Sequence, residues 1–384
     1  MTHLLGAKGL VIGTAWSDGV SIGSRSIERG DCAGPRSARR VLLHPDTELA
    51  VFEAGRGGIL REGLGFDKCD VAVVTNIGSG DHLGLSSVEN VEQMFTVKRC
   101  PVDVVMPHGA SVLNAEDPLV ADMARLSDGA VVFFARDSEN AVLKAHLAEG
   151  KKGLFVRDGS IVIAEGSVET QLVTLRDVPL THAGGASFQV LNVLTAVATA
   201  DALGMTGEEI AARLSSFRAD AVPGRFEFIG GWPGTVILDD AHNVSAVEAL
   251  ISACKPIDAR LKTIVFSAGP GRRDDDLVEQ AKLVGAAFDR VVLYEDSSVD
   301  GRPEGELTAV LRRGLAQSGA HPEVLEIAHQ DLAILTALDR LRAGELLVIQ
   351  TEDGRIDATR QHVRELTEAR VEKRRGDAVA SFPA

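Results

Sequence analysis

Acidic and histidine side chains directly follow two apolar runs of the sequence. Glu53 comes after the run LAVF and leads into a glycine-rich stretch with Arg56 and Arg61, and His82 comes shortly after the run VAVVTNIG. In open α/β sheets, ligands bind beyond the carboxyl ends of the strands, so polar residues at these positions are candidates for chemistry. A carboxylate can hold a hard cation such as Mg²⁺, and His82 can bind a metal or contact a transferring phosphoryl group. Flexible glycines would let the backbone approach an anionic ligand.

The same residues also have purely structural interpretations. Glu53 can cap a helix while Arg56 and Arg61 form surface ion pairs, and a loop histidine is more often a solvated side chain. Both interpretations stay open on these residues alone.

A lysine follows the second of these runs at helical spacing from apolar residues. Lys98 lies seven residues after Val91 and three after Phe95, which places it on the same face of an expected helix. Its ammonium group either snorkels past the core or points into a cleft.

A third polar cluster follows the run TVIL. Asp239 and Asp240 end the expected strand, His242 and Asn243 form the turn, and Asn243 or Ser245 can cap the next helix. Capping accounts for Asn243 but not for two consecutive acids and a histidine at one strand end.

The segment SAGPGRRD places arginines where an expected strand passes through a glycine turn into a helix. Arg272 and Arg273 precede Asp274, and backbone donors and positive charge converge at such a position, which favours an anion site. A plain strand-turn-helix with a solvated run of charges is the competing interpretation.

Apolar runs of strand length recur along the whole chain. Most are apolar throughout, as expected for parallel strands covered on both faces, and helical patterns separate several of them. We therefore predict an α/β protein. In the first half, strands are expected at residues 9–15, 48–55, 71–78, 103–109 and 130–136, with a later hairpin across residues 158–159.

The second half predicts a separate, smaller domain. Five strand-length runs, TVILDDA, TIVFSAG, RVVLYED, EVLEIA and ELLVIQT, alternate with helix-length segments after the punctuating residues VPG. We expect domains at residues 1–221 and 222–368 and a frayed tail at residues 369–384.

Composition limits the function classes. The chain has 384 residues, 45% of them apolar, which is enough for two cores, and its net charge of −15 argues against nucleic acid or a membrane surface as a partner. No apolar run approaches the roughly 20 residues of a membrane helix. The four cysteines lack metal-site spacing, and their pattern fits a reducing cytoplasm.

Taken in order, seven segments resemble the Mur ligase family, and specifically the Mur-like half of cyanophycin synthetases. They are EAGRGGILREGLGF, VVTNIGSGDHLGL, VKR, FQVLNVLTAVATA, VPGRFE, DDAHN and AGPGRRD. The resemblance implies a Mur-ligase-like central domain, with a mostly parallel sheet flanked by helices, followed by a Rossmann-like α/β C-terminal domain. It also implies ATP and Mg²⁺ as cofactors.

The resemblance implies a role for each matching residue. Glu53 and His82 would hold magnesium, with Lys98, His82 and Arg61 as the catalytic candidates. Contacts to the nucleotide, to a carboxylate or to phosphate are implied for Asn192, Arg225, Asp239 (on the ribose), His242, Asn243, Arg56 and Arg272.

The family's phosphate-binding loop has no counterpart in the sequence. No G-x-x-x-x-G-K-[ST] occurs, and the resemblance places Met1 near the end of that loop, so an N-terminally truncated central domain is expected. Asp240 also stands where the family usually has tyrosine.

Two functions stay open. One is an ATP-dependent ligase that uses an acyl-phosphate mechanism to add an amino acid such as arginine to an aspartate side-chain carboxyl, with a cyanophycin-like acceptor. The other is a non-catalytic scaffold or subunit that binds peptide or a partner. For the ligase, a homo-oligomer is one expectation, and a partner chain that supplies the missing loop is another.

Overall fold

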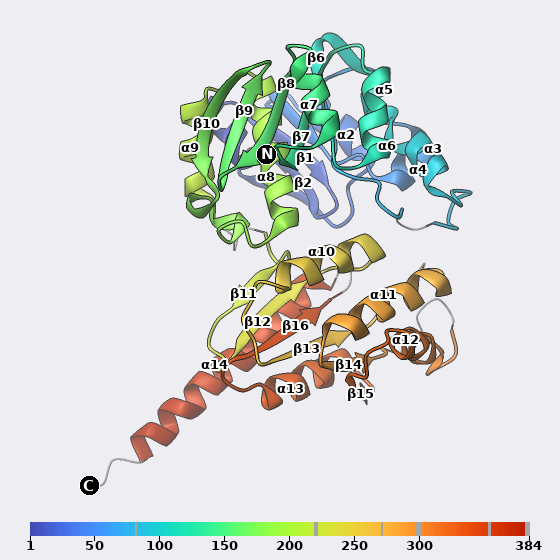
Figure 1. The fold of residues 1–384 in the computed structure, drawn as a ribbon, viewed down its shortest axis with the longest axis vertical. Helices are drawn as coiled ribbons and strands as arrows, with labels where there is room; N and C mark the ends of the chain where they lie inside the picture. Colours follow the sequence, from blue (N-terminus) through green and yellow to red (C-terminus); the bar gives the residue numbers. More distant parts are fainter. Residues whose placement is uncertain (81–82, 219–221, 270–271, 297–301, 352–354, 381–384) are drawn as a thin grey trace. The chain divides into compact units, whose positions relative to one another are not determined.

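The structure is a computed structural model that describes residues 1–80, 83–218, 222–269, 272–296, 302–351 and 355–380, with side chains up to Glu372 in the last helix. Contacts between Cα atoms divide the chain into two compact units, Met1–Arg218 and Ala219–Ala384 (Figure 1). The division lies close to the domain boundary expected at residues 221–222.

Unit 1 alternates strands and helices. Its strands are β1 (Ile12–Trp16), β2 (Gly19–Ile22), β3 (Arg25–Arg29), β4 (Leu49–Phe52), β5 (Cys69–Val74), β6 (Val105–Asn114), β7 (Ala130–Asp137), β8 (Lys152–Arg157), β9 (Ser160–Glu165) and β10 (Val168–Thr174). Its helices are α1 (Thr2–Leu5), α2 (Pro35–Leu42), α3 (Arg56–Glu62), α4 (Val91–Lys98), α5 (Cys100–Asp103), α6 (Pro118–Asp122), α7 (Ala141–Ala148), α8 (Ser187–Ala202) and α9 (Gly207–Ser216).

Among the described residues, these strands form a six-stranded sheet of order β10-β9-β8-β7-β6-β5 and a four-stranded sheet of order β3-β2-β1-β4. Strands β5 to β8 pair in parallel, and β9 and β10 extend them in antiparallel pairs. The predicted α/β class with parallel-rich sheets is therefore confirmed. The six-stranded sheet is the mostly parallel sheet that was expected. The sequence did not indicate the second sheet, in which β1 and β4 pair in parallel and β2 and β3 add antiparallel pairs.

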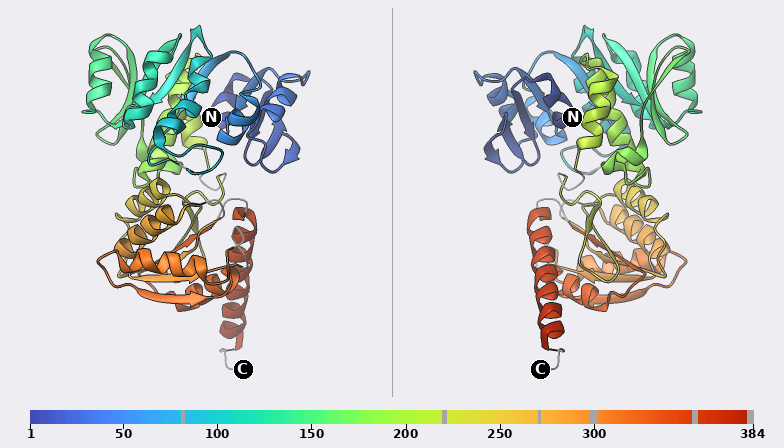
Figure 2. Two further views of the ribbon diagram at one scale, coloured as in Figure 1. Left: turned by 90° about the vertical axis from the view of Figure 1, so that its right-hand side faces the viewer. Right: turned by 90° about the vertical axis from the view of Figure 1, so that its left-hand side faces the viewer.

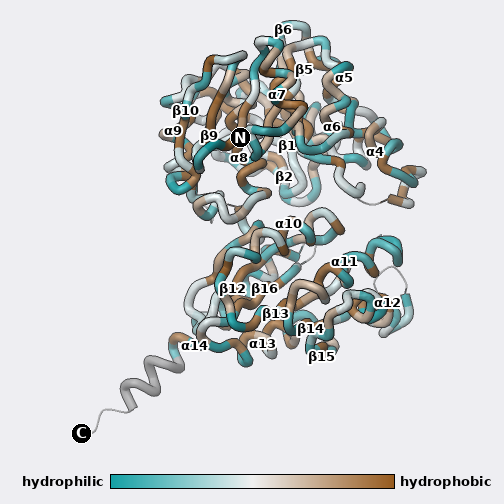
Figure 3. The backbone as a smooth tube through the Cα atoms, in the orientation of Figure 1, coloured by the Kyte–Doolittle hydropathy of each residue, from teal (hydrophilic) through white to brown (hydrophobic). Residues whose placement is uncertain are grey.

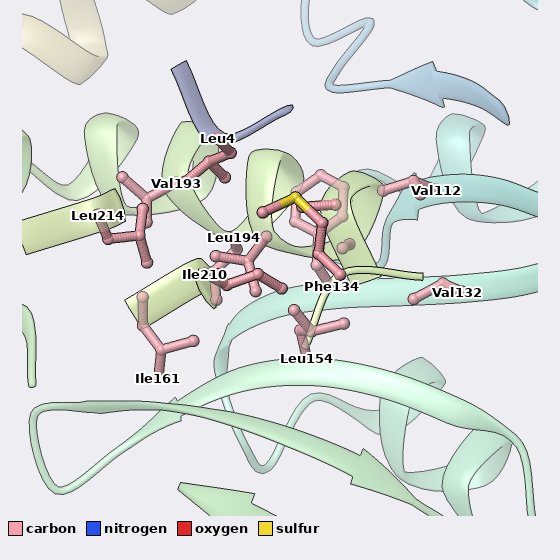
Figure 4. Packing of buried hydrophobic residues seen from close by; sticks show 14 of the residues in the cluster. Leu4, Val112, Val132, Phe134, Leu154, Ile161, Val193, Leu194, Ile210 and Leu214 are labelled. Carbon is pink, nitrogen blue, oxygen red and sulfur yellow. The ribbon is translucent and has the colours of Figure 1, made fainter. Parts of the chain in front are cut away.

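Residue alternation gives the six-stranded sheet two apolar faces. Val112, Phe134 and Leu154 pack with Leu194 of α8 and Ile210 of α9 (Figure 4). Their neighbours along the strands point to the other face and pack against α4 to α7, in a cluster that includes Leu113, Phe133, Phe155, Met94, Val102, Val120 and Leu143. Covering both faces explains why these strands are apolar throughout.

Two turn predictions in unit 1 are confirmed. Asp158 and Gly159 both have positive φ, 50° and 70°, as a two-residue hairpin turn requires. Gly204 follows α8 with φ 78°, which suits the residue after a helix end. Of the run predicted at residues 103–109, residues 105–109 belong to β6. The register shifts before Ala110, and the continuous parallel pairing to β5 comes from residues 110–113.

Unit 2 contains one sheet of order β11-β12-β16-β13-β14-β15 in its described residues. The strands are β11 (Glu227–Ile229), β12 (Thr235–Asp239), β13 (Leu261–Phe266), β14 (Arg290–Tyr294), β15 (Glu323–Ile327) and β16 (Glu345–Gln350). The helices are α10 (Val244–Cys254), α11 (Asp274–Ala287), α12 (Glu306–Ala316), α13 (Gln330–Arg340) and α14 (Ile356–Ala380). All five predicted strands are present and parallel, and β11 adds an antiparallel edge.

Helices cover both faces of this sheet. Figure 2 shows α10 and α11 on one face and α14 on the other. Alternate strand residues such as Leu238, Val265 and Leu347 form a core with Ile334 of α13 and Val363 of α14. Figure 3 shows hydrophobic stretches along the central strands of this unit.

The expected frayed tail is helical instead. α14 continues from Ile356 to Ala380, through most of the segment predicted as a tail from residue 369. Around residue 369 the helix contacts Trp232. The Trp232 Nε1 donates to Thr367 Oγ1 at 2.9 Å, and the Arg370 guanidinium lies 4.8 Å from the Trp232 ring centroid. These contacts tie the helix to unit 2 close to the point where the tail was expected to begin.

Candidate functional site

Glu53 follows β4 and is held by the turn between β1 and β2. Its Oε2 accepts hydrogen bonds from Ser17 N at 2.8 Å and from Ser17 Oγ at 2.9 Å, and the residue is exposed. The helix that follows begins after Gly55 with no side-chain cap, so the alternative that Glu53 caps a helix is wrong. The structure thus presents an oriented, solvent-accessible carboxylate at the carboxyl end of β4.

A flexible loop was expected in the glycine-rich stretch after Glu53. The structure instead has the helix α3 there, and the residues on both sides of the helix are closely packed. A Cβ atom on Gly55 would lie 2.6 Å from the Ala33 carbonyl oxygen, and one on Gly65 would lie 2.5 Å from the Pro35 carbonyl oxygen. These glycines are needed because the residues that flank α3 closely approach the backbone at the start of α2.

The two arginines of this stretch have different settings. Arg56 donates from Nη1 to the Leu85 carbonyl oxygen at 3.0 Å and so ties α3 to the loop after β5. Arg61 is exposed in the last turn, with its guanidinium beside Gly57. Arg61 therefore stays a prediction for carboxylate or phosphate contact, while Arg56 also shapes the loop.

His82, one of the predicted metal ligands, lies outside the described residues. The loop that leads to it bends at Gly78 and Gly80, whose φ angles are 57° and 83°. The predicted need for an unusual backbone here is confirmed, because β-carbon-bearing residues rarely adopt such angles. Asn76, just before this bend, is exposed and accepts from Thr75 Oγ1 at 3.2 Å.

Two residues that sequence reasoning missed hold this loop. Asp117 caps α6 with Oδ1, and its Oδ2 accepts from Ile77 N at 2.7 Å and from Gly78 N at 2.9 Å. Asn114 donates from Nδ2 to the Thr75 carbonyl oxygen at 2.8 Å. The Asp-Pro pair at the start of α6 is a helix-start signal that could have drawn attention to Asp117, but its second contact is long-range.

Lys98 is the last residue of α4 and is half-buried. The helix buries Met94 and Val97, while Val91 and Phe95 are only partly buried against the same core. The predicted face of Val91, Phe95 and Lys98 therefore borders the core. This position suits a lysine with a buried stem and an accessible ammonium group.

Asn192 lies exposed on α8. Its Nδ2 donates to Oε1 of the buried Gln189 at 3.1 Å. This bond orients the Asn192 amide, and its nucleotide contact stays a prediction.

In unit 2, Asp239 is buried at the carboxyl end of β12. Its Oδ2 accepts from Phe226 N at 2.8 Å and its Oδ1 accepts from Ala241 N at 2.9 Å. Burial, and then the neighbouring Asp240 charge, raise the pKa of Asp239 from 3.8 to about 7, although both backbone bonds and Arg225 oppose the shift. The carboxylate thus organises the backbone, and its contact with the ribose stays a prediction.

The second acid of this cluster is paired with an arginine. Asp240 is buried and forms an ion pair with the half-exposed Arg225. His242 donates from Nδ1 to the Asp240 carbonyl oxygen at 2.7 Å, and this nitrogen lies 4.0 Å from Asp240 Oδ2. Arg225, Asp240 and His242 therefore lie together in one polar cluster. The sequence had placed Asp240 and His242 together, but it did not indicate that Arg225 joins them.

Asn243 has the structural role that the sequence allowed for it. Its Oδ1 accepts from Ala246 N at 2.9 Å and caps α10. Of the two capping candidates, Asn243 is therefore the one that caps. A further contact to nucleotide stays a prediction.

A buried glutamine joins three strand ends of unit 2 and was not predicted. Gln350 Oε1 accepts from Ser267 N at 3.2 Å, and its Nε2 donates to the Ala241 carbonyl oxygen at 3.1 Å. It thereby links the ends of β16, β13 and β12. Its place at the end of the apolar run LLVIQ was the only signal in the sequence.

The arginine segment before α11 is held by ion pairs. Arg273 forms a two-pronged pair with Asp276, with both N–O distances 2.9 Å. Arg302 lies 2.8 Å from Asp274 and donates to the Arg272 carbonyl oxygen at 3.4 Å. The start of α11 is therefore held by ion pairs of Arg273 and Asp274, and it is not a plain run of solvated charges. The contact of Arg272 with an anion stays a prediction.

The candidates are divided between the two units. Unit 1 holds Glu53, Arg56, Arg61, Lys98 and Asn192, and unit 2 holds Arg225, Asp239, Asp240, His242, Asn243 and Arg272. In the part of the chain that is described, no group of three or more His, Cys, Asp and Glu side chains could hold a metal by itself. No described helix is long and apolar enough to cross a membrane.

Comparison with known proteins gives family matches for both units. Residues 1–200 match the Mur ligase middle domain, and residues 224–351 match the Mur ligase, glutamate ligase domain. The chain is 36% identical over 353 residues to the cyanophycin synthetase of Crocosphaera subtropica, covering 91% of this chain and 40% of that protein. It therefore spans about 40% of the length of this relative.

A more distant relative and a solved structure are also similar to this chain. The UDP-N-acetylmuramoyl-L-alanyl-D-glutamate–2,6-diaminopimelate ligase of Chlorobaculum tepidum is 28% identical over 373 residues, with 91% of this chain and 67% of that protein covered. A bifunctional folylpolyglutamate synthase/dihydrofolate synthase, solved with Mn, AMPPNP and L-glutamate, shares the fold with a TM-score of 0.67 at 16% identity, covering 94% of this chain and 85% of that one. The chain belongs to the Mur ligase family.

Proposed function

We propose that this chain works in ATP-dependent amide-bond formation between a carboxylate and an amino acid. Membership of the Mur ligase family supports this proposal, and one structural observation carries it: the exposed Glu53 carboxylate is oriented by Ser17 at the carboxyl end of β4. Mg²⁺ is bound in proteins by one or two carboxylates together with substrate phosphates, so one such group fits it.

The residues of unit 1 would hold the reacting end of the nucleotide. Glu53 and His82 would hold Mg²⁺, which would neutralise charge on the transferring phosphoryl group. Both hydrogen bonds of Glu53 that the structure shows are to Oε2, in keeping with a metal contact at Oε1. Lys98 would add positive charge toward phosphate or substrate, and Arg61 would contact a carboxylate.

The residues of unit 2 would hold the nucleotide and preserve the local backbone. Arg225 is half-exposed although it is paired with Asp240, so its guanidinium can also contact an anionic ligand. Asp239 keeps this region in place through Phe226 N and Ala241 N.

The similarity to cyanophycin synthetases supports a finer proposal for the substrates. The acceptor would be an aspartate side-chain carboxyl, and the added amino acid would be arginine. ATP would phosphorylate the carboxyl group, and the arginine amine would then displace phosphate and leave an amide.

The ligation test compares two proteins, because the 384 residues contain no G-x-x-x-x-G-K-[ST] loop. One is this chain as it stands, and the other carries such a loop fused before Met1. Each is given Mg²⁺, ATP, L-arginine and an aspartate-rich peptide, and arginine-dependent phosphate release and the peptide mass are measured. We expect the loop-bearing protein to add arginine, and Glu53→Ala to abolish the addition. Absence of both nucleotide binding and arginine addition in the loop-bearing protein would refute the proposal.

One alternative is that the 384 residues, which contain no such loop, act as a non-catalytic subunit or scaffold that binds peptide or a partner. The lysine and backbone donors of such a loop normally surround the phosphates, and phosphoryl transfer depends on that positioning. Binding of the aspartate-rich peptide without turnover, unchanged in Glu53→Ala and Lys98→Ala, would support this alternative.

A further inference from the structure

Arg225 lies between two residues with left-handed backbone. Gly224 has φ 64° and Phe226 has φ 60°. Phe226 carries a Cβ and is 2% exposed, and such a residue keeps this conformation only where its surroundings enforce it. The direction of the Arg225 side chain therefore depends on contacts that fix both of its neighbours.

Buried carboxylates fix both neighbours of Arg225. Phe226 N donates to Asp239 Oδ2 at 2.8 Å, and Gly224 N donates to Glu227 Oε2 at 3.0 Å. Hydrogen bonds from backbone N–H groups to ionised carboxylates are stronger than neutral ones.

The C-terminal helix holds the second of these carboxylates. Arg360 Nε of α14 donates to Glu227 Oε1 at 2.8 Å, and Arg364 Nη2 lies 3.5 Å from the same oxygen. The Glu227 side chain is 6% exposed and that of Arg360 is 19% exposed, so water screens this pair little.

α14 also packs directly on this turn. A Cβ atom on Gly224 would lie 2.5 Å from Cγ2 of Ile356, the first residue of α14. The helix lies beyond residues 224–351, the segment that matches the family's C-terminal domain. Its contact with the Arg225 turn is therefore a feature outside the matched segment.

We infer that Arg360, acting through Glu227, is a positioning residue that sets the direction of Arg225 toward its anionic ligand. The contribution to ligand binding rests on the proposed function. The coupling of α14 to the turn rests on the structure alone. Removing Arg360 takes away the shorter of the two guanidinium contacts of the buried Glu227 and leaves only Arg364 at 3.5 Å, which loosens the hold of Glu227 on Gly224 N.

The test uses two measurements on the whole chain. Amide spectra of ¹⁵N-labelled protein report the Gly224 N–H bond, and titration with a fluorescent ATP analogue in Mg²⁺ reports ligand affinity. The variants are Arg360→Met, Glu227→Gln, the double variant and the conservative Arg360→Lys. The matched control is Arg340→Met, which removes an ion pair to Glu323 with both side chains about half-exposed.

We expect Arg360→Met to move the Gly224 amide proton upfield and to weaken binding of the analogue about tenfold, the effect of one charge-assisted hydrogen bond. The double variant should be no weaker than Glu227→Gln, because both changes break one chain of contacts. Arg360→Lys should recover part of the affinity, and Arg340→Met should change neither signal.

An unchanged Gly224 signal in Arg360→Met would overturn the inference. An altered signal with unchanged affinity would overturn the role in ligand binding. If the native chain does not bind the analogue, the proposed function is weakened, and the Gly224 signal alone then decides whether Arg360 acts on the turn. If Arg360→Met does not fold, Glu227→Gln and Arg360→Lys give the same readouts.

Discussion

The carboxyl ends of the strands look alike in the two units as sequence, but they differ as structure. Glu53 follows β4 with an exposed carboxylate, whose one oxygen accepts two bonds from Ser17. Asp239 ends β12 with a carboxylate that is 5% exposed and has both oxygens bound to backbone N–H groups. An acid after an apolar run can therefore offer charge to a ligand or hold the backbone, and burial separates the two roles.

Removing each acid in turn tests whether the two carboxylates differ in their contribution to stability. We expect Asp239→Ala to lower the free energy of unfolding of unit 2 by about 3 kcal/mol, because two buried N–H groups lose their acceptor. Glu53→Ala should change stability by less than about 0.5 kcal/mol, as for other exposed sites. Urea unfolding followed by Trp232 fluorescence in a Trp16→Phe background measures the first effect, and circular dichroism measures the second. Equal losses would contradict the distinction.

Glu53, whose removal should cost little stability, should matter most for activity. In the loop-bearing protein we expect Glu53→Ala to lower arginine addition at least about 100-fold, because metal-assisted charge neutralisation is lost. Glu62→Ala is the matched control, since Glu62 is a nearby exposed acid paired with Arg36. Activity of Glu53→Ala within a few fold of the native level would remove Glu53 from the metal site.

The acids should also differ in their dependence on pH. The pKa of Asp239 is about 7 in the folded chain and 3.8 in its ordinary state, so between these values the folded state holds a proton that the unfolded state has released. The stabilisation that Asp239 contributes is therefore fully present below about pH 4. It is lost as the pH rises to 7, by on the order of 4 kcal/mol.

This dependence can be isolated from other titrating groups. The difference in unfolding free energy between the native chain and Asp239→Asn, measured from pH 5 to pH 8, should fall as the pH rises. A difference that stays flat or grows with pH would show that the raised pKa of Asp239 does not govern stability.

The smallest expected effect concerns the helix cap beside this cluster. Asn243→Ala should cost about 1 kcal/mol of unfolding free energy, because Ala246 N loses its cap acceptor, and Asn243→Asp should retain most of the stability. Urea midpoints of the two variants test this. A loss well above that of Asp239→Ala would mean that the cap, and not the buried acid, organises the end of β12.

Local patterns predicted much of the fold. The five parallel strands of unit 2 follow from apolar runs, and Asn243 and the glycines at 78 and 80 follow from capping and turn chemistry. The strands β2 and β3 were missed because β2 is only four residues long and β3 is mostly exposed. The extent of α14 was missed because its last turns offered no apolar stripe.

The site was less predictable because its decisive contacts join distant residues. Asp239 bonds to Phe226, 13 residues earlier, and Glu227 bonds to Arg360, 133 residues later. Asp117 reaches Ile77 across 40 residues. Residue types and spacing indicated where ligands could bind, but they could not show which carboxylates the backbone already occupies.

The most direct test of the account is where Mn²⁺·ATP sits on the loop-bearing protein. Paramagnetic Mn²⁺ broadens the signals of nearby amides, so an amide spectrum with and without Mn²⁺·ATP locates the metal. The account predicts strong broadening at Ser17 and Ala54, beside Glu53, and its loss in Glu53→Ala. If the signals of Ser17 and Ala54 do not broaden, the assignment of Glu53 to the metal and phosphate end of the nucleotide is contradicted.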